Sequence, residues 1–174
     1  MFVERGVLMF NIRKATPEDA LGISIVNVYT WKTTYTGVLP DEVIDKRIDE
    51  LLDRAKDKSA EIEKEDNFIV ATFDNTIIGF CNYGKSRDEA FLASGEINAL
   101  YILKGFQHMG LGKKLFDAAT MKLSQRGYTS VIINCLQGNP ALQFYKHMGG
   151  EIVSSRKDEF NGKIITADIL YFTS

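Results

Sequence analysis

The feature that most constrains the fold is a strand, turn, helix and strand order in the second half of the chain. The apolar run INALYIL (97–103) precedes the stretch QHMGLGKK (107–114), and a helical pattern follows it. Four apolar residues of that pattern share one helix face: Leu111, Leu115, Ala119 and Leu123. The continuous apolar run SVIINCLQ (130–137) comes next and is typical of a buried strand.

Gly110 and Gly112 stand where the strand gives way to the helix. Glycine has no Cβ, so its backbone can adopt positive φ and can approach a ligand closely. The first amides of a helix have no intrahelical acceptor, and the helix dipole places about half a positive charge there. This junction therefore favours binding of a phosphate group.

The remaining patterns predict a mixed sheet with helices on its faces. Thr16 and Pro17 begin a helix whose predicted apolar stripe is Leu21, Ile25 and Val28. Pro40 opens a second helix, followed by a solvated helix end or loop over 57–66. The predicted apolar residues of the helix that Pro40 opens are Ile44, Ile48, Leu51, Leu52 and Ala55. Hairpins are predicted around Asp74-Asn75 and Asn161-Gly162, and a short helix after Asn139-Pro140.

Composition narrows the class of protein. Of 174 residues, 45% are hydrophobic and 25% charged, as in an ordinary single globular domain, and a net charge of −2 without a basic tract disfavours nucleic acid. Cys81 and Cys135 lie in apolar runs, so we expect buried free thiols and no metal site. No segment is apolar enough to cross a membrane and no secretion signal is recognisable, so we expect a cytoplasmic protein.

The first eight residues, MFVERGVL, precede a second methionine, Met9, where a cleaner pattern begins. Glu-Arg-Gly can be encoded by a purine-rich run, as in a ribosome-binding region. We therefore interpret residues 1–8 as an N-terminal extension translated from such a region, with Met9 as the true start. Residues 9–174 would then form one domain.

Two common phosphate-binding motifs do not fit the glycine stretch. A Walker A loop needs Lys and Ser or Thr after its second glycine, but Leu111 follows Gly110. A dinucleotide fingerprint needs a different glycine spacing, near the first strand. QHMGLG does match Gln-x-x-Gly-x-Gly after a strand, and here the chain resembles the GNAT superfamily of N-acetyltransferases. The segments TWKTTYTGVLPDEVID (30–45), ALYIL (99–103) and NPALQFYKHMGG (139–150) resemble that family in the same order.

The resemblance implies a single-domain α/β (α+β) fold, with a mixed, mostly antiparallel sheet flanked by helices, and acetyl-CoA as cosubstrate without a metal. It places the pyrophosphate on the loop amides of Gln107, His108, Met109, Gly110, Leu111 and Gly112, with Lys113 near the phosphates. The same comparison assigns the pantetheine arm to the backbone of Leu100, Tyr101 and Ile102 and to Asn139.

Acetyl transfer to an amine needs a proton acceptor, an oxyanion donor and an acid for the leaving thiolate. By resemblance, Glu96 is the candidate base, directly or through a water chain. A backbone N–H of the 100–102 strand would bind the oxyanion, and Tyr145 would protonate the thiolate. No basic side chain adjoins either cysteine in the sequence, so we expect direct transfer in a ternary complex.

The resemblance also indicates where an acceptor would bind. In the family the first helices and the closing hairpin line the acceptor side, which points to Tyr29, Trp31 and Tyr35 and implies a small-molecule or peptide amine. A non-catalytic acetyl-CoA sensor or partner-binding module remains the alternative. The closing strands could also pair across a homodimer.

Overall fold

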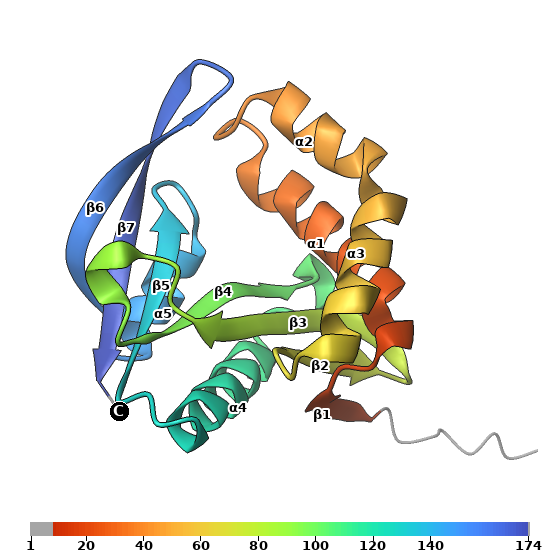
Figure 1. Ribbon diagram of the computed structural model, residues 1–174. Coiled ribbons are helices and arrows are strands. Elements are labelled where there is room, and N and C mark those ends of the chain that lie inside the picture. The colour runs from red at the N-terminus through yellow and green to blue at the C-terminus, as the bar shows by residue number, and fades with distance from the viewer. Residues whose placement is uncertain (1–8, 174) are drawn as a thin grey trace, which may run out of the picture.

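The computed structural model describes residues 9–173 as a seven-stranded sheet with helices on both faces (Figure 1). The strand order is β1-β2-β3-β4-β5-β7-β6, and only β4 and β5 pair in parallel. The strands are β1 Phe10–Lys14, β2 Phe68–Phe73, β3 Thr76–Lys85, β4 Gly95–Ile102, β5 Ser130–Leu136, β6 Glu151–Phe160 and β7 Lys163–Thr173. The predicted mixed, mostly antiparallel α/β fold is confirmed. The proposed extension over residues 1–8 lies outside the described residues.

Five α-helices and three short 3-10 turns connect these strands. The helices are α1 Ala20–Tyr35, α2 Asp41–Asp49, α3 Leu51–Lys64, α4 Leu111–Gln125 and α5 Ala141–His147. The 3-10 turns are η1 Pro17–Asp19, η2 Glu89–Phe91 and η3 Lys104–Phe106. None of the helices within residues 9–173 is long and apolar enough to cross a membrane.

Two cores lie on opposite faces of the sheet. One contains the predicted α4 stripe, whose members are at most 1% exposed and pack on β2, β3, β4 and β5 together with α5. The other lies under α1 and α3, where Ile23 and Val26 contact Phe68, Val70 and Phe80. Cys81 and Cys135 are buried free thiols, as predicted.

The predicted stripe of α1 is wrong at two positions. Leu21 and Ile25 are each 46% exposed, whereas Val28 is buried. Ile23 and Val26 are buried in their place. Positions 21, 25 and 28 share one helix face, but so do 23 and 26, and the sequence spacing could not decide which face would meet the sheet.

The second predicted helix is divided in two. α2 ends at Asp49 and α3 begins at Leu51, and Leu52 is 65% exposed instead of buried. The segment predicted as solvated is helical up to Lys64, and Ile62 within it packs under α1. The break allows α3 to lie on the sheet while α2 turns toward the β6–β7 hairpin.

A third, smaller core joins that hairpin to the end of α1 and to α2. Tyr35, Leu39 and Ile44 contact Ile165 there, with Phe160 packed at the edge. Both hairpin turns form as predicted: Asp74, Asn75, Asn161 and Gly162 all have positive φ, typical of tight two-residue turns. This third core positions the hairpin beside the helices that line the candidate site.

Candidate active site

The centre of the candidate site is a divergence between the two parallel strands. β4 and β5 pair only through Gly95 with Val131 and Glu96 with Ile132. Beyond Glu96 the strands separate, so within the described chain the edge of β4 that faces β5 has no strand partner up to Ile102. Leu100, Tyr101 and Ile102, predicted to bind the pantetheine arm, lie on this open segment and pair only with β3.

A register irregularity in the β3–β4 pair accompanies the divergence. Tyr83 pairs with Ile97 and Asn82 with Ala99, so Asn98 is an extra residue in β4. A bulge of this kind bends a strand and increases its twist. The Oδ1 atoms of Asn98 and of Asn134, on β5, are buried without a donor in the described chain. Buried acceptors without a donor are costly, so a ligand N–H would be favoured here.

The glycine loop, residues 107–113, runs from the end of η3 into the first turn of α4. His108 and Gly110 both have positive φ, of 63° and 78°. Gly110 is the N-cap of α4, and the first helical bond runs from the Lys114 N–H to the Gly110 carbonyl. The amides of Leu111, Gly112 and Lys113 therefore precede the helical hydrogen bonds, which is the arrangement of an anion site at a helix N-terminus.

Gln107 fastens the glycine loop to the open strand. Its Nε2 donates to the carbonyl oxygen of Ile102 at 3.0 Å. A Cβ at Gly112 would lie 3.3 Å from Phe144 on α5, so this glycine permits close packing of the two helices, whereas a Cβ at Gly110 would meet no atom within 4 Å. Lys113 Nζ lies 2.6 Å from the Asp117 carboxylate, one turn along α4.

Glu96 is buried at the point where the strands part, with 2% of its surface exposed. Its carboxylate accepts hydrogen bonds from the Arg87 amide at 2.9 Å, from Arg87 Nη2 at 3.1 Å and from Asn134 Nδ2 at 3.3 Å. Gly95 faces Leu123 of α4, so the alternation of β4 directs Glu96 to the opposite face of the sheet. The carboxylate thus holds the β3–β4 loop to the sheet on the face that bears α1.

Tyr145 lies in the core beneath the open segment of β4. Its side chain is 6% exposed, and burial raises the pKa of its hydroxyl well above the ordinary value, assisted by the neighbouring Tyr101 and both cysteines. No hydrogen bond of its hydroxyl is found within residues 9–173. Phe144, its neighbour, packs edge-on against the Tyr145 ring, with the ring centroids 5.4 Å apart. A protonated phenol is thus held without a fixed partner.

Asn139 links α5 to α1. Its Oδ1 accepts from the Ala141 amide at 2.9 Å, and its Nδ2 donates to the Tyr35 hydroxyl at 3.0 Å. The first contact satisfies an amide at the start of α5, as an N-terminal cap does. The second joins the two segments that flank the divergence.

The predicted acceptor-side aromatics are only partly brought together. Tyr35 is buried and packs edge-on against Trp31, at 5.0 Å between ring centroids, and Trp31 Nε1 donates to the Tyr101 hydroxyl at 3.2 Å. Tyr29 is 61% exposed, because two residues along a helix correspond to a rotation of about 200° away from Trp31. Trp31, Tyr35 and Tyr101 are called the aromatic cluster below.

Arg47, Arg87, Asn98 and Asn134 are contributors that the sequence patterns did not identify. They come from α2, the β3–β4 loop, β4 and β5, and no fixed spacing relates them. Arg47 lies over the Trp31 ring, and Arg87 pairs with Glu96. Only the tertiary structure places them around the aromatic cluster and the divergence of the strands.

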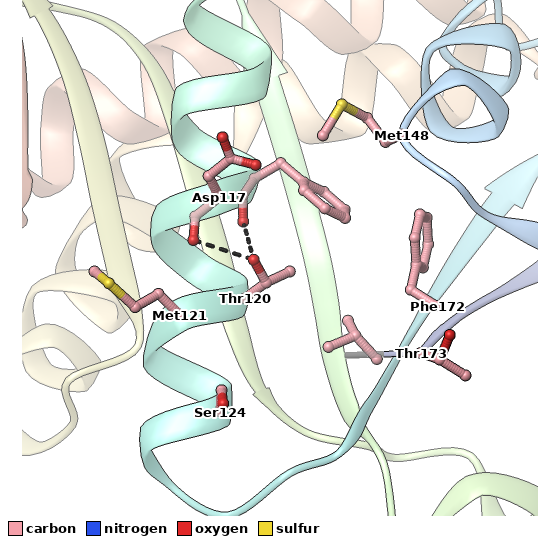
Figure 2. Close-up of a pocket in the computed structure, with 9 residues that line it drawn as sticks. Asp117, Thr120, Met121, Ser124, Met148, Phe172 and Thr173 are labelled. Carbon is pink, nitrogen blue, oxygen red and sulfur yellow. Dashed lines mark hydrogen bonds between the residues drawn. The ribbon is translucent and has the colours of Figure 1, made fainter.

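Two cavities are lined by these elements and their neighbours. A cavity of about 320 Å³ is lined by the later turns of α4 and by Val131, Met148 and Phe172, at the end of the sheet where β4 and β5 still pair (Figure 2). A second, of about 270 Å³, lies between α2 and the turn of the β6–β7 hairpin, with Arg47 in its wall. The second adjoins the aromatic cluster.

An open strand edge beside a glycine loop at a helix N-terminus defines a class of protein that binds a phosphate-bearing, amide-containing ligand. The comparisons agree with this class. A model of the acetyltransferase (GNAT) domain matches residues 64–149. The uncharacterized N-acetyltransferase YuaI of Bacillus subtilis (strain 168) is 28% identical over 155 residues, which cover 88% of this chain and 87% of that protein. The spermidine N(1)-acetyltransferase of Thermoplasma acidophilum is 25% identical, over 88% and 95% of the respective chains.

Solved structures have the same fold. The PaiA N-acetyltransferase of Thermoplasma acidophilum, in complex with coenzyme A, gives a TM-score of 0.75 at 20% identity, over 95% of this chain and 99% of that one. The putative acetyltransferase yncA of Salmonella typhimurium, with its cofactor acetyl-CoA, gives 0.72 at 15% identity, over 95% and 94%. Residues 64–149 thus match the acetyltransferase (GNAT) domain, and the chain has the fold of these acetyltransferases.

Proposed function

We propose that the protein transfers the acetyl group of acetyl-CoA to a primary amine, directly and within a ternary complex. The observation that supports this most is the open edge of β4, whose last residue, Ile102, shares one core with Leu111 of the glycine loop and with Tyr145. The three elements provide an anion site, a row of backbone groups and a proton donor. Acetyl transfer from a phosphate-bearing thioester requires all three.

Acetyl-CoA would be held by backbone groups for most of its length. The amides of the glycine loop would bind the pyrophosphate, and the open edge of β4 would pair with the amides of the pantetheine arm. The unpaired Oδ1 atoms of Asn98 and Asn134 supply two further acceptors beside that edge. Lys113 already pairs with Asp117, so a contact to a phosphate would require its side chain to turn away from that partner.

The proposed reaction conserves atoms and charge. The neutral amine nitrogen attacks the thioester carbonyl carbon, and an N–H of the open β4 edge binds the oxygen as it becomes negative. The C–S bond then breaks, the thiolate takes the proton of the Tyr145 hydroxyl, and the amine nitrogen releases one proton to a water. A proton returns from solvent to the Tyr145 phenolate, so the enzyme is restored with no net change of protons. The products are an N-acetyl amide and the free thiol of coenzyme A.

Burial suits Tyr145 to the role of acid. A raised pKa keeps the phenol protonated at pH values where primary amines begin to lose their protons. The same apolar surroundings disfavour the leaving thiolate and increase its affinity for that proton.

Glu96 is proposed as the base through an intervening water. Three donors already occupy its carboxylate, which leaves little room for direct contact with the amine. A water bound to one of its oxygens could accept the proton and transfer it.

The test is thiol release from acetyl-CoA, measured with and without a panel of amines, for the wild type and for Tyr145→Phe. Phenylalanine keeps the ring, so acetyl-CoA affinity, measured by calorimetry, should remain within about threefold while kcat falls by roughly 10²-fold or more. Thermal unfolding should change little, because the hydroxyl has no partner in the described chain. Acetyl-CoA binding without amine-dependent turnover would contradict the proposal and favour a sensor of acetyl-CoA.

A further inference from the structure

Arg47 on α2 has two contacts, and both are with uncharged groups of α1. Its guanidinium carbon lies 3.4 Å from the centroid of the Trp31 ring. Its Nη1 donates to the Asn27 side-chain oxygen at 2.9 Å. Stacking on an aromatic face leaves the edges of the planar guanidinium available, and only one of its five N–H groups is engaged by a described side chain.

No carboxylate within residues 9–173 forms an ion pair with Arg47. Glu50, which lies between α2 and α3, is 2.6 Å from Arg54 and 3.8 Å from Lys46. Burial, with the positive charge of Arg54 nearby, lowers the pKa of Arg47 to about 10. A half-buried charge held without a counterion is costly, and an anion that completed the pair would recover part of that cost.

The position of Arg47 relates it to the proposed reaction centre. The Trp31 ring lies under the guanidinium and also donates to Tyr101 on the open segment of β4. Tyr35 packs on Trp31 and accepts from Asn139, at the start of α5. Arg47 therefore packs on the aromatic cluster, on the face of the sheet that bears α1. The helix α4 and the glycine loop adjoin the opposite face.

The cavity beside Arg47 is open enough for part of a small molecule. Its volume is about 270 Å³, and Arg54, Phe160 and Asn161 are among the residues that line it. Glu42, Glu50 and Glu159 also line it. Glu42 and Glu159 are exposed, so solvent weakens their charges, and Glu50 already pairs with Arg54 and Lys46. The half-buried charge that a ligand would meet there without a partner is that of Arg47.

We propose that Arg47 binds a carboxylate of the acceptor, so that the protein selects small amines that also carry a carboxylate over polyamines. The inference rests on the proposed function and specifies its substrate class. An arginine fork and a carboxylate can form two parallel hydrogen bonds, which fix the orientation of the acceptor. A polyamine would instead bring further positive charge to Arg47 and Arg54 and would be disfavoured.

The test uses pairs of acceptors that differ only in the carboxylate: L-lysine with cadaverine, L-phenylalanine with phenethylamine, and spermidine as a polyamine. We expect the wild type to prefer the amino acid of a pair by roughly tenfold or more in kcat/KM. Arg47→Gln should raise KM for the amino acid by roughly tenfold and leave the decarboxylated amine within about threefold.

Two further variants separate recognition from folding and net charge. Lys56→Gln removes an exposed positive charge from α3, outside the cavity, and should leave the preference unchanged. Arg47→Lys keeps the charge but loses the fork, and it should give an intermediate KM if Arg47→Gln proves unstable in thermal unfolding.

Each outcome either supports or overturns the inference. A preference for spermidine or for the decarboxylated amines would overturn it, as would an equal effect of Arg47→Gln on both members of a pair. These results would leave acetyl transfer to an amine intact. Acetyl-CoA binding without turnover of any member of the panel would instead overturn the proposed function, and the inference with it.

Discussion

Replacement of Gly110 should separate the backbone requirement of the glycine loop from its role in anion binding. Gly110 has φ of +78°, and a Cβ there would meet no atom within 4 Å. The cost of Gly110→Ala is therefore that of a left-handed backbone alone, about 1–2 kcal/mol. For a chain of 174 residues, each kcal/mol lowers Tm by roughly 2–4 °C, so we expect a decrease of roughly 2–8 °C.

Gly110→Glu should share this loss of stability and add a carboxylate to the proposed pyrophosphate site. We expect acetyl-CoA affinity at least roughly tenfold below that of Gly110→Ala, because like charges repel at the helix N-terminus. Tm would be followed by circular dichroism and affinity by calorimetry. The comparison of the two variants isolates the effect of the charge.

Two controls accompany these variants. Gly110→Asn should retain most of the stability, since asparagine tolerates the left-handed region. Gly105→Ala lies in open space five residues earlier and should leave both Tm and affinity near the wild-type values. An unchanged Tm in Gly110→Ala would refute the backbone argument. Equal affinities of the alanine and glutamate variants would refute the anion site.

Two other predictions concern buried carboxylates. The Arg13 guanidinium, 2.6 Å from Asp19, holds the pKa of that carboxyl below its usual range, with the Thr16 amide as a further donor, so Asp19 stabilises the fold above the unfolded pKa of about 3.9. Asp19→Asn should cost about 1 kcal/mol at pH 7, and the difference in Tm should shrink as pH falls below about 4. Glu96→Gln should lower kcat by roughly 10²-fold and alter the pH profile of kcat/KM; an unchanged profile would leave Glu96 only the role of holding Arg87.

Elements with a strong local signal were predicted well. The α4 stripe, the Asp74-Asn75 and Asn161-Gly162 turns and the buried strand β5 all formed as expected. Their patterns depend on neighbours within a few residues, and the physics of turns and amphipathic helices is local. The errors at Leu21, Ile25 and Leu52 came from helices that contact several partners, where spacing alone cannot decide which side is buried.

The residues of the candidate site also fall into those with a local sequence signal and those without one. One short motif contains Gln107, Gly110 and Gly112. It could be recognised in the sequence because an anion site at a helix N-terminus is built from amides that are consecutive along the chain. Arg47 and Arg87 had no signal, because their partners Trp31 and Glu96 lie on other elements. Tyr29 was included with Trp31 for its residue type, although the helix turns the two in different directions.

The sequence by itself determined the order of most of the elements and the position of the glycine loop that we propose binds phosphate, since both arise from contacts between residues close along the chain. The tertiary structure decided the divergence of β4 from β5 beyond Glu96 and the position of Arg47 over Trp31. These features depend on strand pairing and on the packing of α2 beside the β6–β7 hairpin. Such long-range contacts have no fixed spacing in the sequence, so they become visible only when the chain is folded.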